Sequence, residues 1–365
     1  MLISNQNLQQ YRLLVSIPCL GEFKTLPATL QSLETNDLLD ETLVTVVVNN
    51  RKGAPETEDN QKMLQWLREY QGKLNLAWVD HSSPGSELPE KRGVGLARRC
   101  GFEYSSKHIH DDGIFIWLDG DTIVQDNYLK AIDDFYKNSD YQAGWVRFSH
   151  STSDSVEENQ AIKMYERHMA YYVRGLQYAG SVYAFPTIGS TVTSTARAYF
   201  KAGGVNAKRM AGEDFYFMQQ LVKTGTSVGC IDQTEIYPSP RVSTRVPFGT
   251  GKAVGDILQN GNYMTYHPSC FEYVKEFIAL VTKDYFASVE GIQKLVGSRL
   301  DEWLELNNFY KSWSKVQDNC KSKEQIAHQF ICWFDAFRIL KLIHWLTEHY
   351  YPEIDINELD GKEFS

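Results

Sequence analysis

The strongest constraint on the fold is the alternation of short apolar runs with segments of helical periodicity. Residues 13–17 and 43–48 are apolar runs, the second rich in valine, and residues 25–36 between them combine a threonine N-cap, a proline in the first turn and leucines at helical spacing. Further apolar runs occupy residues 74–79 and 115–118. Strands that alternate with helices pair in parallel, and buried parallel strands have few polar residues. We therefore expect an α/β fold with an open, mostly parallel twisted sheet flanked by helices.

The regular alternation ends in the second half of the chain, and residues 268–350 show helical periodicity without a strand pattern. We expect a first domain of residues 1–267 and an appended C-terminal helical region of residues 268–365. The most apolar late segment, residues 330–346, contains four interspersed charged or histidine residues and falls short of a membrane-spanning helix. A core helix is the expectation, and a helix that faces a membrane surface or a partner protein is the alternative.

Charge and cysteine usage narrow the class of partner. The net charge is −9 and there is no long basic run, which argues against nucleic acid as a ligand. Six cysteines occur without a CxxC pair, which favours reduced buried thiols over disulfides or a zinc site. The N-terminal stretch has none of the features of a signal peptide, so we expect a cytoplasmic location.

Two aspartates flank a glycine directly after the apolar run of residues 115–118: Asp119, Gly120 and Asp121. Ligands of open α/β sheets bind beyond the carboxyl ends of the strands, which is where these carboxylates should lie. Two carboxylates around a flexible glycine can converge on one divalent cation and bridge it to phosphate oxygens. The alternative is a pair that caps a helix or closes a turn.

A second acidic pair, Glu213 and Asp214, precedes an apolar helical segment. A carboxylate at the same cleft could act as a general base, whereas the plainer interpretation is a helix start whose dipole favours acidic residues. Downstream, Arg241 and Arg245 lie in a loop that contains prolines and glycines. These arginines could stabilise an anionic leaving group, and a solvated connector is the alternative.

Taken together and in order, these motifs resemble the family 2 glycosyltransferases of the GT-A fold over residues 11–231. The resemblance rests on VSIP followed by Glu22, then VVVNN, KRGVGLARRCGFEY and LDGDTIVQDNYL, and finally AGGVN, GEDF and VKTG. It implies an inverting enzyme that moves a sugar from a nucleotide-diphosphate-sugar donor, a UDP- or GDP-sugar, to a hydroxyl of a carbohydrate or other acceptor. It also implies a divalent cation, Mn²⁺ or Mg²⁺.

Carried over to this sequence, the resemblance assigns donor contacts to Pro18, Glu22 and Asn49 around the nucleotide base, and to Arg98 near the diphosphate. Family members more often have aspartate where Asn49 stands, so the resemblance does not select a base. Arg98 has the alternative of an ordinary exposed helix arginine.

The resemblance also assigns the acidic residues. Asp119, with Gly120 beside it, would contact the donor or a metal-bound water, and Asp121 would bind the metal directly. Asp214 would be the catalytic base, with Glu213 as its neighbour at the acceptor. His267 follows the basic loop, where some family members supply a metal ligand; a packed histidine is the alternative.

Two other functions fit parts of the same evidence. The segment DGDT matches the opening motif of haloacid-dehalogenase-like phosphatases, in which Asp119 would be phosphorylated and Asp121 would be the acid or base. In those enzymes the motif normally ends the first core strand, whereas three strand candidates precede it here. A non-catalytic nucleotide-sugar binding protein is the second alternative, although a binder has no use for the base that Asp214 offers.

Overall fold

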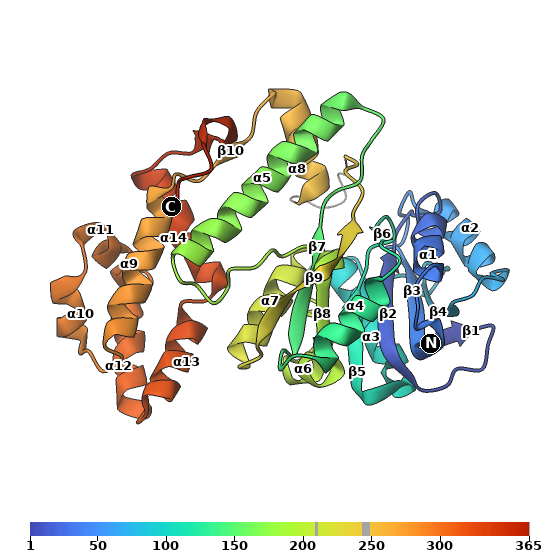
Figure 1. Cartoon of the computed structure of the whole chain (residues 1–365), viewed down its shortest axis with the longest axis horizontal. Helices are drawn as coiled ribbons and strands as arrows, with labels where there is room; N and C mark the ends of the chain where they lie inside the picture. Colours follow the sequence, from blue (N-terminus) through green and yellow to red (C-terminus); the bar gives the residue numbers. More distant parts are fainter. Residues whose placement is uncertain (209–210, 243–248, 365) are drawn as a thin grey trace. The chain divides into compact units, whose positions relative to one another are not determined.

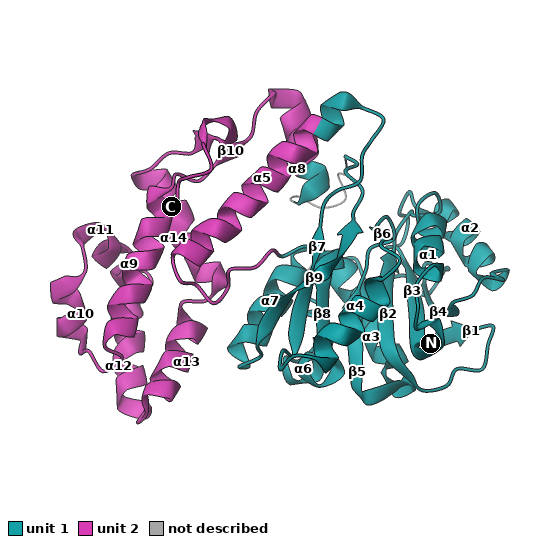
Figure 2. Cartoon of the chain, viewed as in Figure 1, with its two compact units in different colours: residues 1–159, 187–252 teal, residues 160–186, 253–365 magenta. Residues whose placement is uncertain are grey.

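The computed structural model describes residues 1–208, 211–242 and 249–364. The chain forms two compact units, one of residues 1–159 and 187–252 and the other of residues 160–186 and 253–365 (Figures 1 and 2). This division differs from the single boundary expected after residue 267. Residues 160–186 pack with the C-terminal helices, although the sequence places them between elements of the sheet unit.

Among the described residues, nine strands form one sheet in the order β1-β4-β3-β2-β5-β8-β7-β9-β6. The strands are β1 (Leu2–Ser4), β2 (Tyr11–Cys19), β3 (Thr42–Asn49), β4 (Asn75–His81), β5 (Ile109–Trp117), β6 (Ile123–Val124), β7 (Ala143–Phe148), β8 (Val192–Thr195) and β9 (Val228–Tyr237). Strands β4, β3, β2 and β5 are parallel neighbours, while β8 and β6 pair antiparallel with theirs. The expected α/β fold with a mostly parallel sheet is confirmed.

Helices cover both faces of this sheet (Figure 1). Those of the sheet unit are α1 (Leu26–Glu34), α2 (Thr57–Arg68), α3 (Val94–Ser105), α4 (Tyr128–Lys137), α6 (Ala196–Lys201) and α7 (Glu213–Lys223). The leucines of α1 and α2 and the apolar face of α4 pack with β2 and β3 in one large core. Helix α3 packs on the opposite face through Ala97 and Cys100. Burial on both faces explains why these strands read as apolar runs.

The order of the strands reverses beside β2. Strands β3 and β4 follow β2 on one side, and the chain then crosses back to place β5 on the other side of β2. In open α/β sheets the crevice at such a reversal is where ligands bind, outside the carboxyl ends of the strands. The loops that follow β2 and β5 are therefore neighbours, and they carry Glu22 and Asp119 to Asp121.

The second unit is helical apart from a two-stranded pair. It contains most of α5 (Val156–Tyr178) and α8 (Thr250–Asn260), followed by β10 (Met264–Thr265), α9 (Ser269–Lys283), α10 (Val289–Leu295), α11 (Ser298–Leu306), α12 (Phe309–Asn319), α13 (Lys323–Trp333), α14 (Ala336–His349) and β11 (Ile354–Asp355). Its core includes Phe277, whose ring lies 4.7 Å from that of Phe334 between centroids. The expected C-terminal helical region is confirmed.

The apolar segment of residues 330–346 is not one helix. Helix α13 ends at Trp333, and Asp335 caps α14 by accepting a hydrogen bond from the backbone N–H of Arg338 at 3.0 Å. Several apolar side chains of residues 330–346, among them Phe330 and Leu342, are buried, whereas Phe337 is exposed. Within the parts of the chain that the structure describes, no helix is both long and apolar enough to cross a bilayer.

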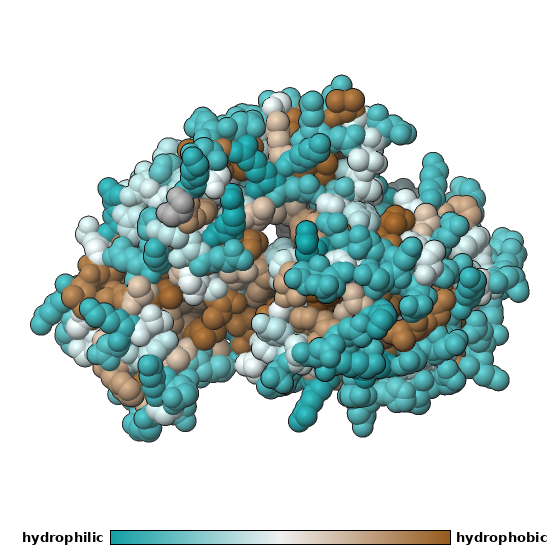
Figure 3. Space-filling model, in the orientation of Figure 1, coloured by the Kyte–Doolittle hydropathy of each residue, from teal (hydrophilic) through white to brown (hydrophobic). Residues whose placement is uncertain are grey.

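Some apolar side chains do reach the surface of the helical unit. Leu295 and Leu306 are 67% and 63% exposed, and the hydropathy colouring of Figure 3 shows such apolar spots scattered among hydrophilic residues on the face in view. Three of the six cysteines, Cys19, Cys100 and Cys270, are buried as expected. Cys230 departs from the expectation, since it lies exposed on β9.

Close packing of α3 on β2 depends on a glycine. A Cβ atom at Gly101 would lie 2.0 Å from Ser16 Oγ and 3.1 Å from Val47 Cγ2. We expect Gly101→Ala to lower the free energy of unfolding by about 1–3 kcal/mol through overpacking, measured by urea denaturation. Gly291→Ala is the matched control, since its Cβ would meet nothing nearer than Ser288 Oγ at 3.5 Å and alanine favours the helix. Equal destabilisation by both changes would contradict this account of the contact.

Candidate active site

The carboxylates after β2 and β5 lie side by side at the strand reversal. Gly120 is in close contact with Glu22: a Cβ atom on the glycine would lie 3.3 Å from Glu22 Cγ. Glu22 is buried and oriented by Thr25, whose hydroxyl donates to Glu22 Oε2 at 2.7 Å. The sequence suggested that Thr25 caps α1, but its hydroxyl makes no capping hydrogen bond. It holds the Glu22 carboxylate instead. Gly120 allows the two loops to approach.

Arg98 connects the two acidic motifs. Its guanidinium donates from Nη2 to Asp119 Oδ1 at 2.7 Å and from Nε to Glu213 Oε1 at 3.4 Å. The arginine is 1% exposed and stacks over the ring of Trp117, with its guanidinium carbon 4.7 Å from the ring centroid. Burial alone would lower the pKa of Arg98, but the charges of Asp119 and Glu213 outweigh it and raise that pKa. Arg98 is thus a buried arginine that forms ion pairs with both Asp119 and Glu213. The alternative of an exposed helix arginine is wrong.

A glycine also covers this ion pair. The backbone of Gly189 runs so close to Arg98 that a Cβ atom there would lie 2.8 Å from Nη2 and 3.4 Å from Asp119 Oδ2. The backbone at Gly189 therefore forms one wall of the site. Residues 187–195 are rich in threonine and serine, and this composition gives no sign of the contact.

Glu213 and Asp214 begin helix α7, behind Gly212 at φ +72°. Glu213 is buried, and this burial raises its pKa against the opposing pull of Arg98. Asp214 is half-buried and accepts a hydrogen bond from the Phe215 backbone N–H at 2.7 Å. Burial, followed by the charge of Glu213, raises the pKa of Asp214 to about 7. A carboxylate with such a pKa can accept a proton near neutral pH.

Arg241 joins the remaining two carboxylates. Its Nη2 contacts Glu22 Oε1 and lies 2.9 Å from Asp121 Oδ2. Burial lowers the pKa of Arg241, yet the hydrogen bond to Glu22 and the charge of Asp121 raise it by more. Arg245, the other arginine expected to bind the donor, lies outside the described residues.

Two of the three residues expected around a nucleotide base lie at the ends of the first two parallel strands, whereas the third, Glu22, pairs with Arg241 beside Asp121. Pro18 is partly exposed in β2, and Asn49 ends β3 at 4% exposure. Asn49 Oδ1 is buried without a hydrogen-bond partner among the described residues. A buried amide oxygen with no partner is uncommon and is available to a donor N–H.

Asn60 is a site residue that the motifs did not indicate. From α2 its amide nitrogen donates to the Asn49 carbonyl at 3.1 Å and to Asn50 Oδ1 at 2.9 Å, while its Oδ1 accepts from the Gly21 N–H at 2.9 Å. Asn60 is fully buried and so joins the ends of β2 and β3. The signal in the sequence is weak, because Asn60 is a single polar residue among the buried positions of α2.

His267 and the acidic residues belong to different compact units. His267 belongs to the helical unit, stacks on Tyr351 with 5.5 Å between ring centroids, and accepts the Ser269 N–H at 3.1 Å through Nδ1. Among residues 1–208, 211–242 and 249–364, no three His, Cys, Asp or Glu side chains are arranged to hold one metal ion.

Two carboxylates of the site nevertheless offer oxygen ligands of the kind that a hard cation prefers. Oxygens of Glu22 and Asp121, from two adjacent loops, converge on the single cationic nitrogen Arg241 Nη2. Carboxylate oxygens are the ligands that Mg²⁺ and Mn²⁺ prefer, and the guanidinium stands where such an ion would be held. Asp119 differs, because Arg98 engages one of its oxygens.

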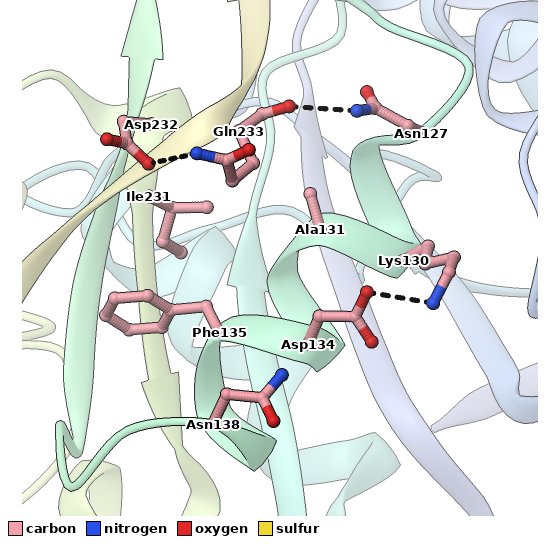
Figure 4. A pocket seen from close by; sticks show the side chains of 9 residues that line it. All are labelled: Asn127, Lys130, Ala131, Asp134, Phe135, Asn138, Ile231, Asp232 and Gln233. Carbon is pink, nitrogen blue, oxygen red and sulfur yellow. Dashed lines mark hydrogen bonds and ion pairs between the residues drawn. The ribbon is translucent and has the colours of Figure 1, made fainter.

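Two surface pockets lie away from these residues. One, of about 420 Å³, lies between α4 and β9 and is lined by Asn127, Lys130, Phe135 and Gln233 among others (Figure 4). The other, of about 770 Å³, lies at the opposite end of β5 from Asp119, near Arg12 and Asp112. None of the residues expected to bind donor, acceptor or metal lines either pocket.

No family of known proteins and no curated protein matches the sequence. Solved structures with an overall likeness include S. aureus TarS 1–349 in complex with UDP-GlcNAc, at 12% identity and a TM-score of 0.49, covering 88% of this chain and 91% of that one. Another is the mannosyltransferase PcManGT from Pyrobaculum calidifontis in complex with GDP-Man and Mn²⁺, at 13% identity and a TM-score of 0.45, covering 90% of this chain and 89% of that one. At these values the likeness assigns no activity.

Proposed function

We propose that the chain is a glycosyltransferase of the GT-A type, similar to family 2, that moves a sugar from a nucleotide-diphosphate-sugar donor to an acceptor hydroxyl. The observation that carries the proposal is the double ion pair of Arg98 with Asp119 and Glu213. It joins the two motifs expected to serve donor and acceptor, which lie far apart in sequence. Asp214 is the neighbour of Glu213 in the second motif, and its pKa is raised to about 7.

The chemistry of transfer follows from these positions. Asp214 takes the proton of the acceptor hydroxyl while the hydroxyl oxygen attacks the anomeric carbon of the donor sugar. The bond from that carbon to the diphosphate oxygen breaks, and the nucleoside diphosphate leaves with the electron pair. One base and one direct displacement invert the configuration at the anomeric carbon.

Other residues bind and orient the reactants. Asn49 and Pro18 would contact the base, and Arg241 would donate to the diphosphate oxygens as negative charge develops. Asp121, with Glu22 beside it, would hold a divalent cation, Mn²⁺ or Mg²⁺, which supplies further positive charge to the diphosphate. Glu213 acts through Arg98 and its neighbour Asp214, so it is a positioning residue.

The phosphatase alternative makes a different use of the same motif. It requires Asp119 to attack phosphorus, but Asp119 is engaged by the buried Arg98. The motif also follows β5, the fifth strand of the chain, and three parallel strands precede it in the sheet. These observations favour the transferase.

A thermal-shift panel tests the proposed function. Uridine, guanosine and thymidine diphosphate sugars are added singly, with and without Mn²⁺, and the melting temperature is recorded. We expect one nucleotide class to stabilise the protein, by about 2.7 kcal/mol at a concentration of 100 times Kd. If no member of the panel raises the melting temperature of a protein that melts cooperatively, the proposed function is wrong.

Asp121→Ala should weaken donor binding in the presence of Mn²⁺ by about tenfold or more, because a charge-bearing contact is worth about 1.5–3 kcal/mol. Titration calorimetry with the donor found in the panel measures the change. Asp111→Ala is the control, since Asp111 is exposed near the other end of β5. Equal losses in the two variants would remove Asp121 from the donor site.

A further inference from the structure

We propose that Arg241 is an internal counter-ion, which the donor's divalent cation displaces from the Glu22 and Asp121 carboxylates. The inference rests on the proposed function for the identity of the donor, but the competition between arginine and cation can be measured without it. It concerns one nitrogen atom, Arg241 Nη2, which lies between carboxylates from the loops after β2 and β5.

The first step is the charge balance of the site. Six charged side chains meet here through ion pairs, four acidic and two basic: Glu22, Asp119, Asp121, Glu213, Arg98 and Arg241. Among the described residues of these ion pairs, the acidic groups exceed the basic ones by two, before Asp214 is counted. A diphosphate carries negative charge of its own, so a divalent cation at these carboxylates would favour its binding.

The second step is that only one of the two arginines can move away at low cost. Arg98 is almost fully buried, pairs on two sides and packs on Trp117. The side chain of Arg241 is 32% exposed and carries five N–H donors, of which Nη2 makes the two carboxylate contacts. Because solvent reaches the side chain of Arg241, this guanidinium is the one that can leave its carboxylates for another anionic partner.

The third step is that the carboxylates stay in place when the arginine leaves. The Glu22 carboxylate is held by the hydroxyl of Thr25, and its backbone carbonyl accepts the N–H groups of Thr25 and Leu26 at 3.1 and 2.9 Å. Asp121 follows β5, the strand paired directly with β2. The oxygens are therefore preorganised on the sheet edge for whichever cation is present.

A divalent ion and a guanidinium cannot share the same oxygens at contact distance. A cation that binds alone must therefore break the contacts of Arg241, which opposes binding. When a diphosphate arrives with the cation, the released arginine gains a new anionic partner with matching fork geometry. Cation and donor should consequently bind with positive coupling, and Arg241 should carry most of it.

Mn²⁺ titration, followed by calorimetry and by electron paramagnetic resonance of the free ion, tests this directly. We expect the wild type to bind Mn²⁺ alone at least tenfold more weakly than Arg241→Gln does. Adding a nucleoside diphosphate should tighten Mn²⁺ binding to the wild type tenfold or more, and to Arg241→Gln by less than threefold. The Mn²⁺ that the free nucleotide binds is subtracted in both cases. Arg241→Lys keeps the charge and should retain the weak binding of Mn²⁺ alone.

Arg197→Gln is the matched control, because Arg197 is exposed and the substitution changes the net charge equally. An Mn²⁺ affinity of Arg241→Gln within twofold of wild type overturns the proposal. A second outcome also overturns the proposal: the wild type binds the donor equally well with and without a chelator, and Arg241→Gln does not bind it. The arginine would then replace the cation permanently. If Arg241→Gln binds Mn²⁺ more tightly but no nucleotide binds the wild type, the counter-ion stands and the proposed donor fails.

Discussion

Replacing Asp214 with asparagine should lower the rate of sugar transfer by about 10²- to 10⁴-fold while donor affinity changes little. The carboxamide has nearly the same shape as the carboxylate but cannot take the acceptor proton, and a general base contributes a factor of this size. Release of nucleoside diphosphate from the donor, with water as acceptor, measures the rate without knowledge of the natural acceptor.

The pH dependence gives a second readout of the same residue. Because the pKa of Asp214 is raised to about 7, the base is protonated and inactive below that pH, so the wild-type rate should rise as pH increases through 7. Asp214→Asn should lose this limb of the profile. Asp232→Asn, an exposed change on β9, is the control and should keep both rate and profile. An Asp214→Asn enzyme with the wild-type rate would exclude Asp214 as the base.

Stability should move in the opposite direction from activity. The folded-state pKa of Asp214 is raised above its unfolded value, so its contribution to stability is full at low pH and is lost as pH rises through about 7. Asparagine carries no charge at any of these pH values. We therefore expect Asp214→Asn to be at least as stable as the wild type at pH 8, so that a lost activity cannot be attributed to unfolding.

Arg98→Met should be the most destabilising change at the site, costing about 3–5 kcal/mol of unfolding free energy. Methionine fills a similar volume but leaves the Asp119 and Glu213 carboxylates without their counter-charge, Glu213 in a buried position. Urea denaturation measures the loss. The matched control is Arg99→Met on the same helix, where the pair with Glu103 is partly exposed and contributes about 0.5 kcal/mol or less.

A double variant separates lost charge pairing from lost packing. If the cost arises from unpaired carboxylates, Arg98→Met combined with Glu213→Gln should be more stable than Arg98→Met alone, because the buried negative charge is gone. A loss in Arg98→Met no larger than that in Arg99→Met would show that the ion pairs contribute nothing to holding the two motifs together.

The sequence predicted the strands that are buried over most of their length. Strands β2, β3, β4 and β5 are apolar through most of their length, so hydrophobic runs revealed them. Strand β8 is four residues long and contains two threonines, and β9 alternates buried and exposed residues with polar side chains among them. Their pairing depends on neighbours distant in sequence, which a local pattern does not contain.

The same limit applies to the site. The two acidic motifs could be found because each is local, but the contacts that unite them are not. Glu22 and Arg241 are 219 residues apart, and Arg98 and Glu213 are 115 apart. The sequence led us to expect Arg98 at the donor diphosphate. Its ion pairs with both acidic motifs became visible only in the folded structure. Likewise, His267 was assigned to the end of the first domain, one residue before the expected helical region, but it packs within the helical unit.

Calorimetric titration of the donor into wild type, Asp121→Ala and Asp214→Asn, with Mn²⁺ present, shows whether the two acidic motifs form one nucleotide-sugar site at the carboxyl edge of the sheet. We expect a wild-type Kd in the range of about 1 μM to 1 mM that is typical of enzyme substrates, a similar value for Asp214→Asn and at least tenfold weaker binding for Asp121→Ala. Donor binding that is absent from the wild type, or unchanged in Asp121→Ala, would contradict this expectation.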